Sequence, residues 1–216
     1  MAETIRVVLA DDHAVVRTGY RRLLELEPDM HVVADLSDSE AVCQWFSTPQ
    51  PTPQAADVLV LDLSMPGRGG LEALAWVKAK QPALRVLIFS MHESPAMVGQ
   101  ALKAGADGYL SKSSEPEALI DGMRQVMRGE QVLSPDLAAA LARQTNPAHL
   151  GLSPREFEIF RLLAAGRSVE EVAQRLYISL KTAANYQTMI RQKTGFGSPV
   201  EMYRHAQAHG LLDGSE

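Results

Sequence analysis

The sequence predicts an α/β chain, with a doubly wound five-stranded parallel sheet followed by a small all-helical domain. Three observations support this prediction. Residues 1–125 alternate short apolar runs with amphipathic segments in five successive pairs. One run, Val58–Leu61, is apolar throughout, which is typical of a strand buried on both faces of a parallel sheet. From residue 150 onward the pattern changes to short helical segments that begin after a serine.

The elements of the first part follow in strict alternation. We expect strands at Ile5–Ala10, His31–Ala34, Val58–Leu61, Arg85–Phe89 and Gly108–Leu110, and helices at Ala14–Glu25, Ser39–Phe46, Gly70–Lys80, Pro95–Ala104 and Glu115–Arg128. Ser114 and Glu117 have the spacing of a capping box for the last helix. Consecutive strand–helix units predict a parallel sheet whose ligand site lies at the carboxyl ends of its strands.

Composition and charge fit an ordinary globular protein, with 46% hydrophobic and 22% charged residues. No apolar run approaches the ~20 residues of a membrane span, so we expect a cytoplasmic protein without a membrane partner. The single cysteine, Cys43, excludes an intrachain disulfide and fits a packing role on a helix face. Ser47–Gln54 contains three prolines and predicts an extended surface loop.

We expect three segments: residues 1–125 form the α/β domain, 126–149 a partly helical linker, and 150–216 the helical domain. The first segment has a net charge of −6 and the last of +1. This mild asymmetry is by itself weak evidence for nucleic-acid binding.

Acidic residues follow two of the predicted strands. Asp11 and Asp12 come after Ile5–Ala10, and Asp62 comes after Val58–Leu61. Asp62 alone also fits a helix cap or a turn, where aspartate is common. Three carboxylates on strand ends would repel one another unless a cation compensates their charge. Mg²⁺ is held in proteins by such carboxylates together with phosphate oxygens and water, so the pattern predicts a magnesium site.

Two further strand ends carry groups that suit a phosphoryl ligand. Ser90 offers a hydroxyl donor and Lys112 a cation. A lysine after a strand is often only solvated, but here it belongs to a set of polar residues at successive strand ends. In such a set the lone carboxylate of Asp62 can act as a nucleophile toward phosphorus. The metal and the lysine would stabilise charge on the phosphoryl oxygens.

With these motifs, residues 1 to about 125 resemble a two-component receiver domain. The resemblance rests on Asp11-Asp12, on Asp62 followed by Ser-Met-Pro-Gly, and on Ser90, Tyr109 and Lys112 in the expected order and spacing. It implies that Asp62 is the phosphoacceptor for a partner sensor histidine kinase. It also implies that Mg²⁺ is held by Asp11, Asp12 and Asp62 with the backbone carbonyl of Ser64.

The same resemblance implies a switch pair, Ser90 and Tyr109, in which the ring turns inward as the hydroxyl engages phosphate. The alternative roles are a serine that caps a strand and a tyrosine of the core. Ser113 departs from the pattern, because many receivers have proline after the lysine; receivers joined to this kind of tail often lack it.

The last segment has four helix starts. Ser153, Ser168 and Ser198 are each followed three residues later by glutamate, the pattern of a capping box, and Ser179 opens the remaining helix. Gly166 and Gly195 are expected helix ends. Short helices with tight turns predict a helix-turn-helix unit. Residues 150 to about 213 resemble the LuxR-type DNA-binding domain of FixJ-like response regulators, and 90–112 are similar to the hexose-phosphate-uptake branch of that family.

The predicted recognition helix departs from this family. Its members usually have Thr-Val-Lys-x-His, whereas this chain has Thr182-Ala-Ala-Asn-Tyr186, with Ala184 at the lysine position. A lost phosphate-contacting lysine weakens binding through counterion release. Asn and Gln side chains can still contact adenine. The candidate DNA contacts are Lys181, Thr182, Asn185, Gln187, Thr188, Arg191 and Lys193; alternatively, these are merely exposed polar residues.

Two functions therefore remain open. The first is a transcription regulator in which phosphorylation of Asp62 relieves packing between the domains and lets the tail bind DNA as a homodimer. The alternative is a phosphorylation-dependent protein-interaction module whose helical tail has weak or no DNA binding. An enzyme is not expected, because a haloacid-type phosphatase would require D-x-D-x-T/V, whereas the chain has Asp62-Leu-Ser-Met-Pro.

Overall fold

The computed structural model describes residues 4–48, 55–143 and 150–212. Its first part is a parallel sheet with the strand order β2-β1-β3-β4-β5-β6. The strands are β1 (Ile5–Ala10), β2 (Met30–Leu36), β3 (Val58–Leu61), β4 (Arg85–Ser90), β5 (Gly108–Ser111) and β6 (Val132–Leu133). The chain therefore reverses its direction of winding between β1 and β3, as expected for a doubly wound sheet.

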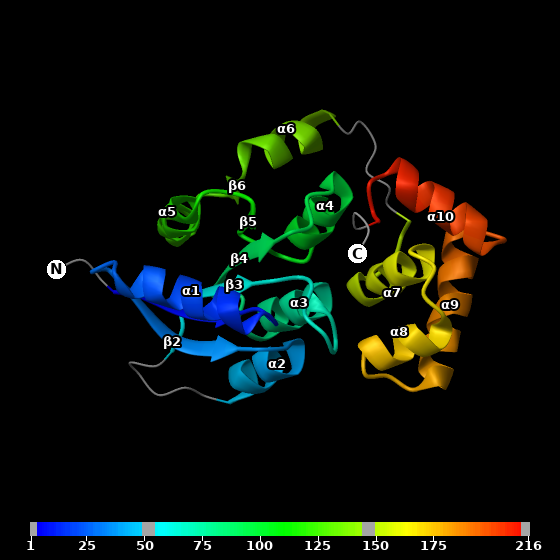
Figure 1. Cartoon of the computed structure of the whole chain (residues 1–216), viewed down its shortest axis with the longest axis horizontal. Helices are drawn as coiled ribbons and strands as arrows, with labels where there is room; N and C mark the ends of the chain where they lie inside the picture. The colour runs from blue at the N-terminus through cyan, green and yellow to red at the C-terminus, as the bar shows by residue number, and fades with distance from the viewer. Residues whose placement is uncertain (1–3, 49–54, 144–149, 213–216) are drawn as a thin grey trace.

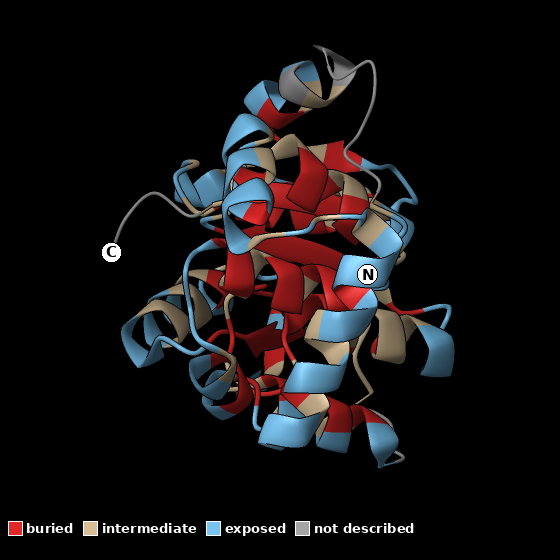
Figure 2. Ribbon diagram, turned by 90° about the vertical axis from the view of Figure 1, so that its right-hand side faces the viewer, coloured by how far each residue is buried: buried red, intermediate tan, exposed pale blue. Residues whose placement is uncertain are grey.

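Helices cover both faces of this sheet (Figure 1). They are α1 (Ala14–Glu25), α2 (Ser39–Ser47), α3 (Gly70–Lys80), α4 (Pro95–Lys103) and α5 (Pro116–Met127), and a further helix, α6 (Pro135–Arg143), packs against α4. Leu24 of α1 and Leu119 of α5 belong to one apolar core, and Leu74 of α3 and Val98 of α4 belong to the other. The inner strands β3, β4 and β5 between the two cores are almost entirely buried, as the red ribbons of Figure 2 show.

The sheet has six strands, so the prediction of five was incomplete. The additional strand β6 pairs with β5 through Gly108 and Val132. Two residues are too few to show the alternation or length that marks a strand in a sequence. The expected capping box of α5 was wrong as well. Pro116 occupies the first turn, and the N-cap is Glu115 rather than Ser114, without a side-chain cap.

The tail consists of α7 (Pro154–Ala164), α8 (Val169–Arg175), α9 (Leu180–Thr194) and α10 (Pro199–Ala208). The capping boxes at Ser153 and Ser168 are complete. Ser179 caps α9, and Gly195 ends it in the left-handed conformation with φ of 74°. At Ser198 the box is only half formed, because the carboxylate of Glu201 accepts from the N–H of Gly197 instead.

The tail packs on the receiver-like part through α7, which lies against α3, while α9 and α10 lie toward the outer side (Figure 1).

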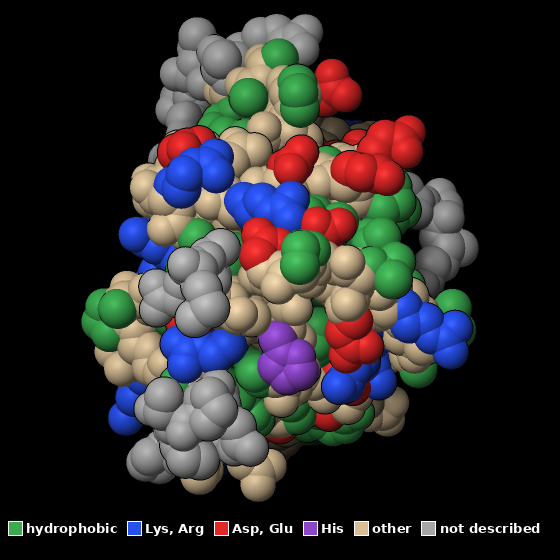
Figure 3. All heavy atoms as spheres, turned by 90° about the vertical axis from the view of Figure 1, so that its left-hand side faces the viewer, with side chains coloured by type: hydrophobic (Ala, Val, Ile, Leu, Met, Phe, Trp, Pro, Cys, Tyr) green, Lys and Arg blue, Asp and Glu red, His purple; other side chains and the backbone are tan. Residues whose placement is uncertain are grey.

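The far side of the α/β part carries both acidic and basic side chains (Figure 3). Arg124 of α5, for example, lies 2.6 Å from Glu27 and 2.8 Å from Asp29. Within the described ranges, no helix combines the length and apolarity that spanning a membrane requires.

Candidate functional site

The backbone register brings the predicted acids together. β1 and β3 are neighbours in the sheet, with Ala10 opposite Leu61, and the N–H of Asp62 donates to the carbonyl of Ala10 over 2.9 Å. The next residues on the two strands, Asp11 and Asp62, therefore leave the sheet side by side. Both are nearly inaccessible, with exposed fractions of 6% and 1%, whereas Asp12 is exposed. The site therefore contains two buried carboxylates, those of Asp11 and Asp62, beside the exposed carboxylate of Asp12.

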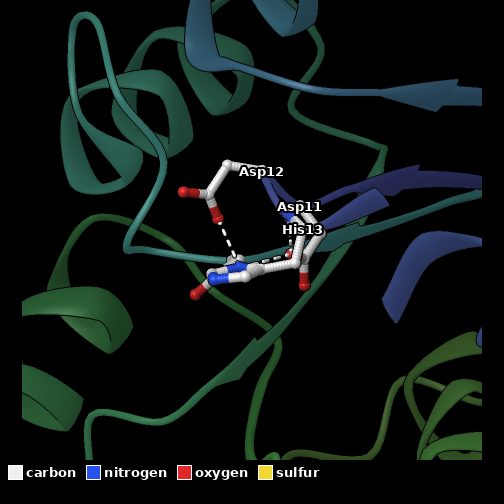
Figure 4. Close-up of side chains that lie close together, drawn as sticks. Asp11, Asp12 and His13 are labelled. Carbon is white, nitrogen blue, oxygen red and sulfur yellow. Dashed lines mark hydrogen bonds and ion pairs between the residues drawn. The ribbon is translucent and has the colours of Figure 1, made fainter. Parts of the chain in front are cut away.

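His13 extends this acidic group (Figure 4). One potential ligand atom from each of Asp11, Asp12, His13 and Asp62 lies within 4.8 Å of the others. The Nδ1 atom of His13 is 2.8 Å from an oxygen of Asp12 and 3.3 Å from one of Asp11. His13 was not among the predicted site residues, although its position directly after two acids was a usable signal. Carboxylate oxygens and an imidazole nitrogen are metal ligands, so this pocket is consistent with a metal site.

Lys112 joins the two buried acids. Its Nζ atom lies 2.5 Å from Asp11 and 2.7 Å from Asp62, at the end of β5. Burial alone would lower the pKa of the Lys112 ammonium, but the charge of Asp62 and the contact with Asp11 outweigh burial and raise it. The amine therefore stays charged beside the carboxylates. A fixed cation here can stabilise negative charge that appears on a group bound to Asp62.

The remaining predicted residues surround the same pocket. The N–H of Ser64 donates to Asp62 over 3.1 Å, which places the loop after β3 at the pocket rim. Ser90 is fully buried at the end of β4, and its hydroxyl oxygen accepts from the N–H of His92. Tyr109 is also fully buried, with its ring turned inward and its hydroxyl donating to the carbonyl of His92 over 2.5 Å. The structure thus brings every predicted receiver residue to one edge of the sheet.

Ser113, at the position where many receivers have proline, takes part in a small network. Its N–H donates to the hydroxyl oxygen of Ser111 over 3.0 Å, and its own hydroxyl donates to Glu93 over 2.8 Å. Contacts from Ser111 and Ser113 lower the pKa of the Glu93 carboxyl. A proline at 113 would remove the first of these hydrogen bonds, because it lacks an N–H.

The predicted DNA contacts lie along α9. Lys181, Asn185, Thr188, Arg191 and Lys193 are exposed, whereas Thr182 and Gln187 are partly covered. Lys193 forms an ion pair with Glu156 of α7 over 2.7 Å, so its charge already has a partner within the domain. Ala184 is exposed on the same helix. The receiver-like part does not cover this helix, and its surface carries polar groups with few cations.

The fold and the pocket together define a receiver domain joined to a helix-turn-helix domain. Residues 7–124 match the response regulator receiver domain family, and residues 150–206 match the bacterial regulatory proteins of the luxR family. The chain belongs to the two-component response regulators with a LuxR-type DNA-binding domain. Members of this family are transcription regulators, not enzymes.

Individual relatives agree with this assignment over nearly the whole chain. The oxygen regulatory protein NreC of Staphylococcus carnosus is 36% identical, covering 97% of this chain and 100% of its own. The transcriptional regulatory protein UhpA of Salmonella typhimurium is 37% identical, covering 97% and 99%. Among solved structures, RcsB of Salmonella enterica bound to the promoter P1flhDC with a phosphomimetic has a TM-score of 0.69. It is 27% identical and covers 95% of this chain and 100% of its own.

Proposed function

We propose that Asp62 is phosphorylated by a partner histidine kinase in the cytoplasm, and that phosphorylation controls DNA binding by the tail. One observation carries the first half of this proposal: Lys112 lies between Asp11 and Asp62 in a pocket whose donor atoms suit a divalent cation. In this proposal, residues 1–125 receive the phosphoryl group, 126–149 link the domains and 150–216 bind DNA.

The chemistry follows from the positions of the side chains. A carboxylate oxygen of Asp62 attacks phosphorus, and the imidazole of the phosphohistidine leaves with the electron pair of its P–N bond. Lys112 pairs with an oxygen of the transferred group, and the Ser90 hydroxyl can donate to another. We assign Mg²⁺ to Asp11, Asp12, Asp62 and the carbonyl of Ser64, because Mg²⁺ prefers oxygen ligands. When bound, it supplies positive charge beside the transferred group.

The proposed DNA contacts are the seven polar residues of α9 named above. RcsB, which shares 27% of its residues with this chain, has been solved in complex with DNA, in one case as two dimers on two parallel DNAs. We propose the same use of the tail here, as a phosphorylation-dependent homodimer. The exposure of Asn185 on α9 supports this proposal, since its amide is accessible to base edges, whereas Gln187 is partly covered.

The alternative, a protein-interaction module, has one observation in its favour. α9 lacks a cation at Ala184, and Lys193 is engaged with Glu156, so few free charges face a phosphate backbone. The two functions differ in a gel-shift experiment with the full chain at low salt, with and without acetyl phosphate and Mg²⁺. Binding that increases on phosphorylation supports the regulator. If the tail binds no DNA under either condition, the interaction module replaces it.

The assignment to the hexose-phosphate-uptake branch has support from the identity of 37% to UhpA. The identity of 36% to NreC is equally high. Overall identity therefore does not decide which signal the partner kinase detects. The assignment to this branch is a proposal that rests on the sequence pattern of residues 90–112.

A further inference from the structure

His92 lies in the loop between β4 and α4, between the acceptor pocket and the tail. We propose that His92 couples the phosphorylation state of Asp62 to the docking of the helix-turn-helix domain, through its contact with Arg161 of α7. This inference rests on the proposed phosphorylation of Asp62. It assigns a positioning role to a residue that carries none of the acceptor chemistry itself.

Three elements of the receiver hold His92 in place. The backbone N–H of His92 donates to the hydroxyl oxygen of Ser90 over 3.3 Å, and its carbonyl accepts from Tyr109 over 2.5 Å. The Nε2 atom of its ring is 3.2 Å from the hydroxyl of Ser64, two residues after the acceptor. The backbone and the ring of His92 are thus both attached to groups that surround Asp62.

The tail contacts the same ring through Arg161. The two terminal nitrogens of Arg161 lie 3.5 Å from Nδ1 and 3.5 Å from Nε2 of His92. The guanidinium therefore spans both ring nitrogens, and any rotation or shift of the imidazole changes this contact. Arg161 and His92 are separated by 69 positions in the sequence, so this contact connects the two domains directly.

A second arginine docks α7 beside this contact. Arg155 is buried and donates to the carbonyls of Gly67 and Arg68, and it forms an ion pair with Glu72 over 3.2 Å. Gly67 and Arg68 follow Ser64 on the loop after β3. The loop that follows the acceptor and the loop that carries His92 therefore form adjacent parts of one docking surface for α7.

Phosphorylation of Asp62 changes the contacts that hold His92. A phosphoryl group on Asp62 presents oxygens that accept a hydrogen bond from the Ser90 hydroxyl. When this hydroxyl turns toward them, the Ser90 oxygen that now accepts from the N–H of His92 shifts. A shift of Ser90 or Tyr109 displaces the His92 backbone, and with it the ring that contacts Arg161. A ligand shifts an equilibrium only through contacts that differ between the two states, and this chain of contacts supplies such a difference.

This mechanism differs from one in which the receiver domain covers the recognition helix α9. The recognition helix already faces solvent while α7 is docked. The contact between His92 and Arg161 thus restrains where the tail sits, rather than covering the residues proposed to bind DNA. Loss of the contact frees the tail to take the arrangement that two copies need on DNA.

Spin-label distance measurements on the full chain test this inference. In a Cys43→Ala background, labels at Arg22→Cys on α1 and Gln192→Cys on α9 report the separation of the domains; both native residues are exposed. We expect acetyl phosphate with Mg²⁺ to shift the distance distribution of the parent chain. His92→Ala should already show the shifted distribution without acetyl phosphate, while Asp62 is still labelled.

Further variants distinguish coupling from a general loss of structure. Arg161→Ala should reproduce the effect of His92→Ala, and the double variant should add nothing, because both remove one contact. His92→Gln retains hydrogen-bonding groups on its side chain and should restore part of the response. His31→Ala, at an exposed histidine of β2, is the matched control and should behave as the parent chain.

Two results would overturn the coupling. One is an unchanged, phosphorylation-dependent shift in His92→Ala; the other is a parent chain whose distances do not respond although Asp62 is labelled. Failure of the proposed function looks different, because acetyl phosphate would then label another residue or none. In that case the comparison of unmodified His92→Ala with the parent chain still tests whether His92 restrains the tail.

Discussion

The acceptor pocket and the recognition helix are built in different ways. In the pocket, parallel strands of one sheet fix the positions of Asp11, Asp62 and Lys112, and Lys112 contacts both carboxylates directly. On α9, most of the candidate side chains are exposed, and the groups of DNA that they would contact are not part of the chain. The arrangement of the pocket can be inferred because the groups that contact one another all belong to this chain. The contacts of α9 cannot be inferred in the same way, because the phosphates and bases that they would meet belong to the DNA.

We expect the largest effect, a loss of phosphoryl labelling, at the acceptor residue. Asp62→Asn should abolish labelling by acetyl phosphate in Mg²⁺, because an amide cannot attack phosphorus as a carboxylate does. The fold should persist, since asparagine has nearly the same shape. Mass spectrometry of the intact chain measures the label, and circular dichroism checks the fold. Undiminished labelling of this variant would move the acceptor to another residue.

A second prediction divides the roles of the paired acids. Asp11 already has an oxygen 2.5 Å from Lys112, whereas Asp12 is exposed and forms an ion pair with the imidazole of His13. Asp12→Ala should therefore remove a direct metal ligand and weaken Mg²⁺ binding on the order of tenfold or more. Asp11→Ala, whose contact we expect to pass through water, should weaken it less.

A fluorescence titration with Mg²⁺ compares these two variants with the parent chain. Asp136→Ala, in α6, serves as a control that removes one carboxylate away from the pocket. Equal and negligible changes in affinity for both pocket variants would contradict the assignment of the metal to this edge of the sheet.

The grouping of Asp11, Asp62 and Lys112 at one edge of the sheet was predictable because each of them follows a strand. The apolar runs located β1, β3, β4 and β5, and the carboxyl ends of parallel strands meet at one edge. The strand β6 was not predictable, since two residues carry no periodic pattern. His92 and Arg161 were not predictable either, because their contact joins two domains, and the sequence does not say how the domains dock.

The docking surface supplies a third prediction, which concerns pH. Burial raises the pKa of the Glu158 carboxyl to about 8, although Arg155 and Arg161 oppose this shift. The docked state therefore binds an additional proton between pH 4.5, the ordinary pKa of the group, and about pH 8. The docked state is most favoured at the acidic end of this window, and docking should weaken as the pH rises through it.

Glu158→Gln removes this titration and should leave the distance between spin labels on the two domains nearly independent of pH over the same window. The backbone of Gly69 approaches this carboxyl closely, because a Cβ at Gly69 would collide with Glu158. Glu117→Gln, at an exposed residue of α5, is the matched control. An unchanged pH response in Glu158→Gln would assign the titration to another group.

The smallest expected effect concerns the recognition helix. Ala184→Lys adds a cation at an exposed position of α9, so DNA affinity should rise, and the slope of log affinity against log salt should steepen by about one unit. The gain should be nearly the same for different DNA sequences, because a phosphate contact positions the helix without distinguishing bases. Gel shifts over a range of salt concentrations measure both quantities.

The control for this prediction is Ala208→Lys, at an exposed position of α10. It adds the same charge on a different helix and should leave the slope closer to that of the parent chain. If Ala184→Lys changes neither affinity nor slope, α9 does not lie along DNA, and the protein-interaction module becomes the better explanation of the tail.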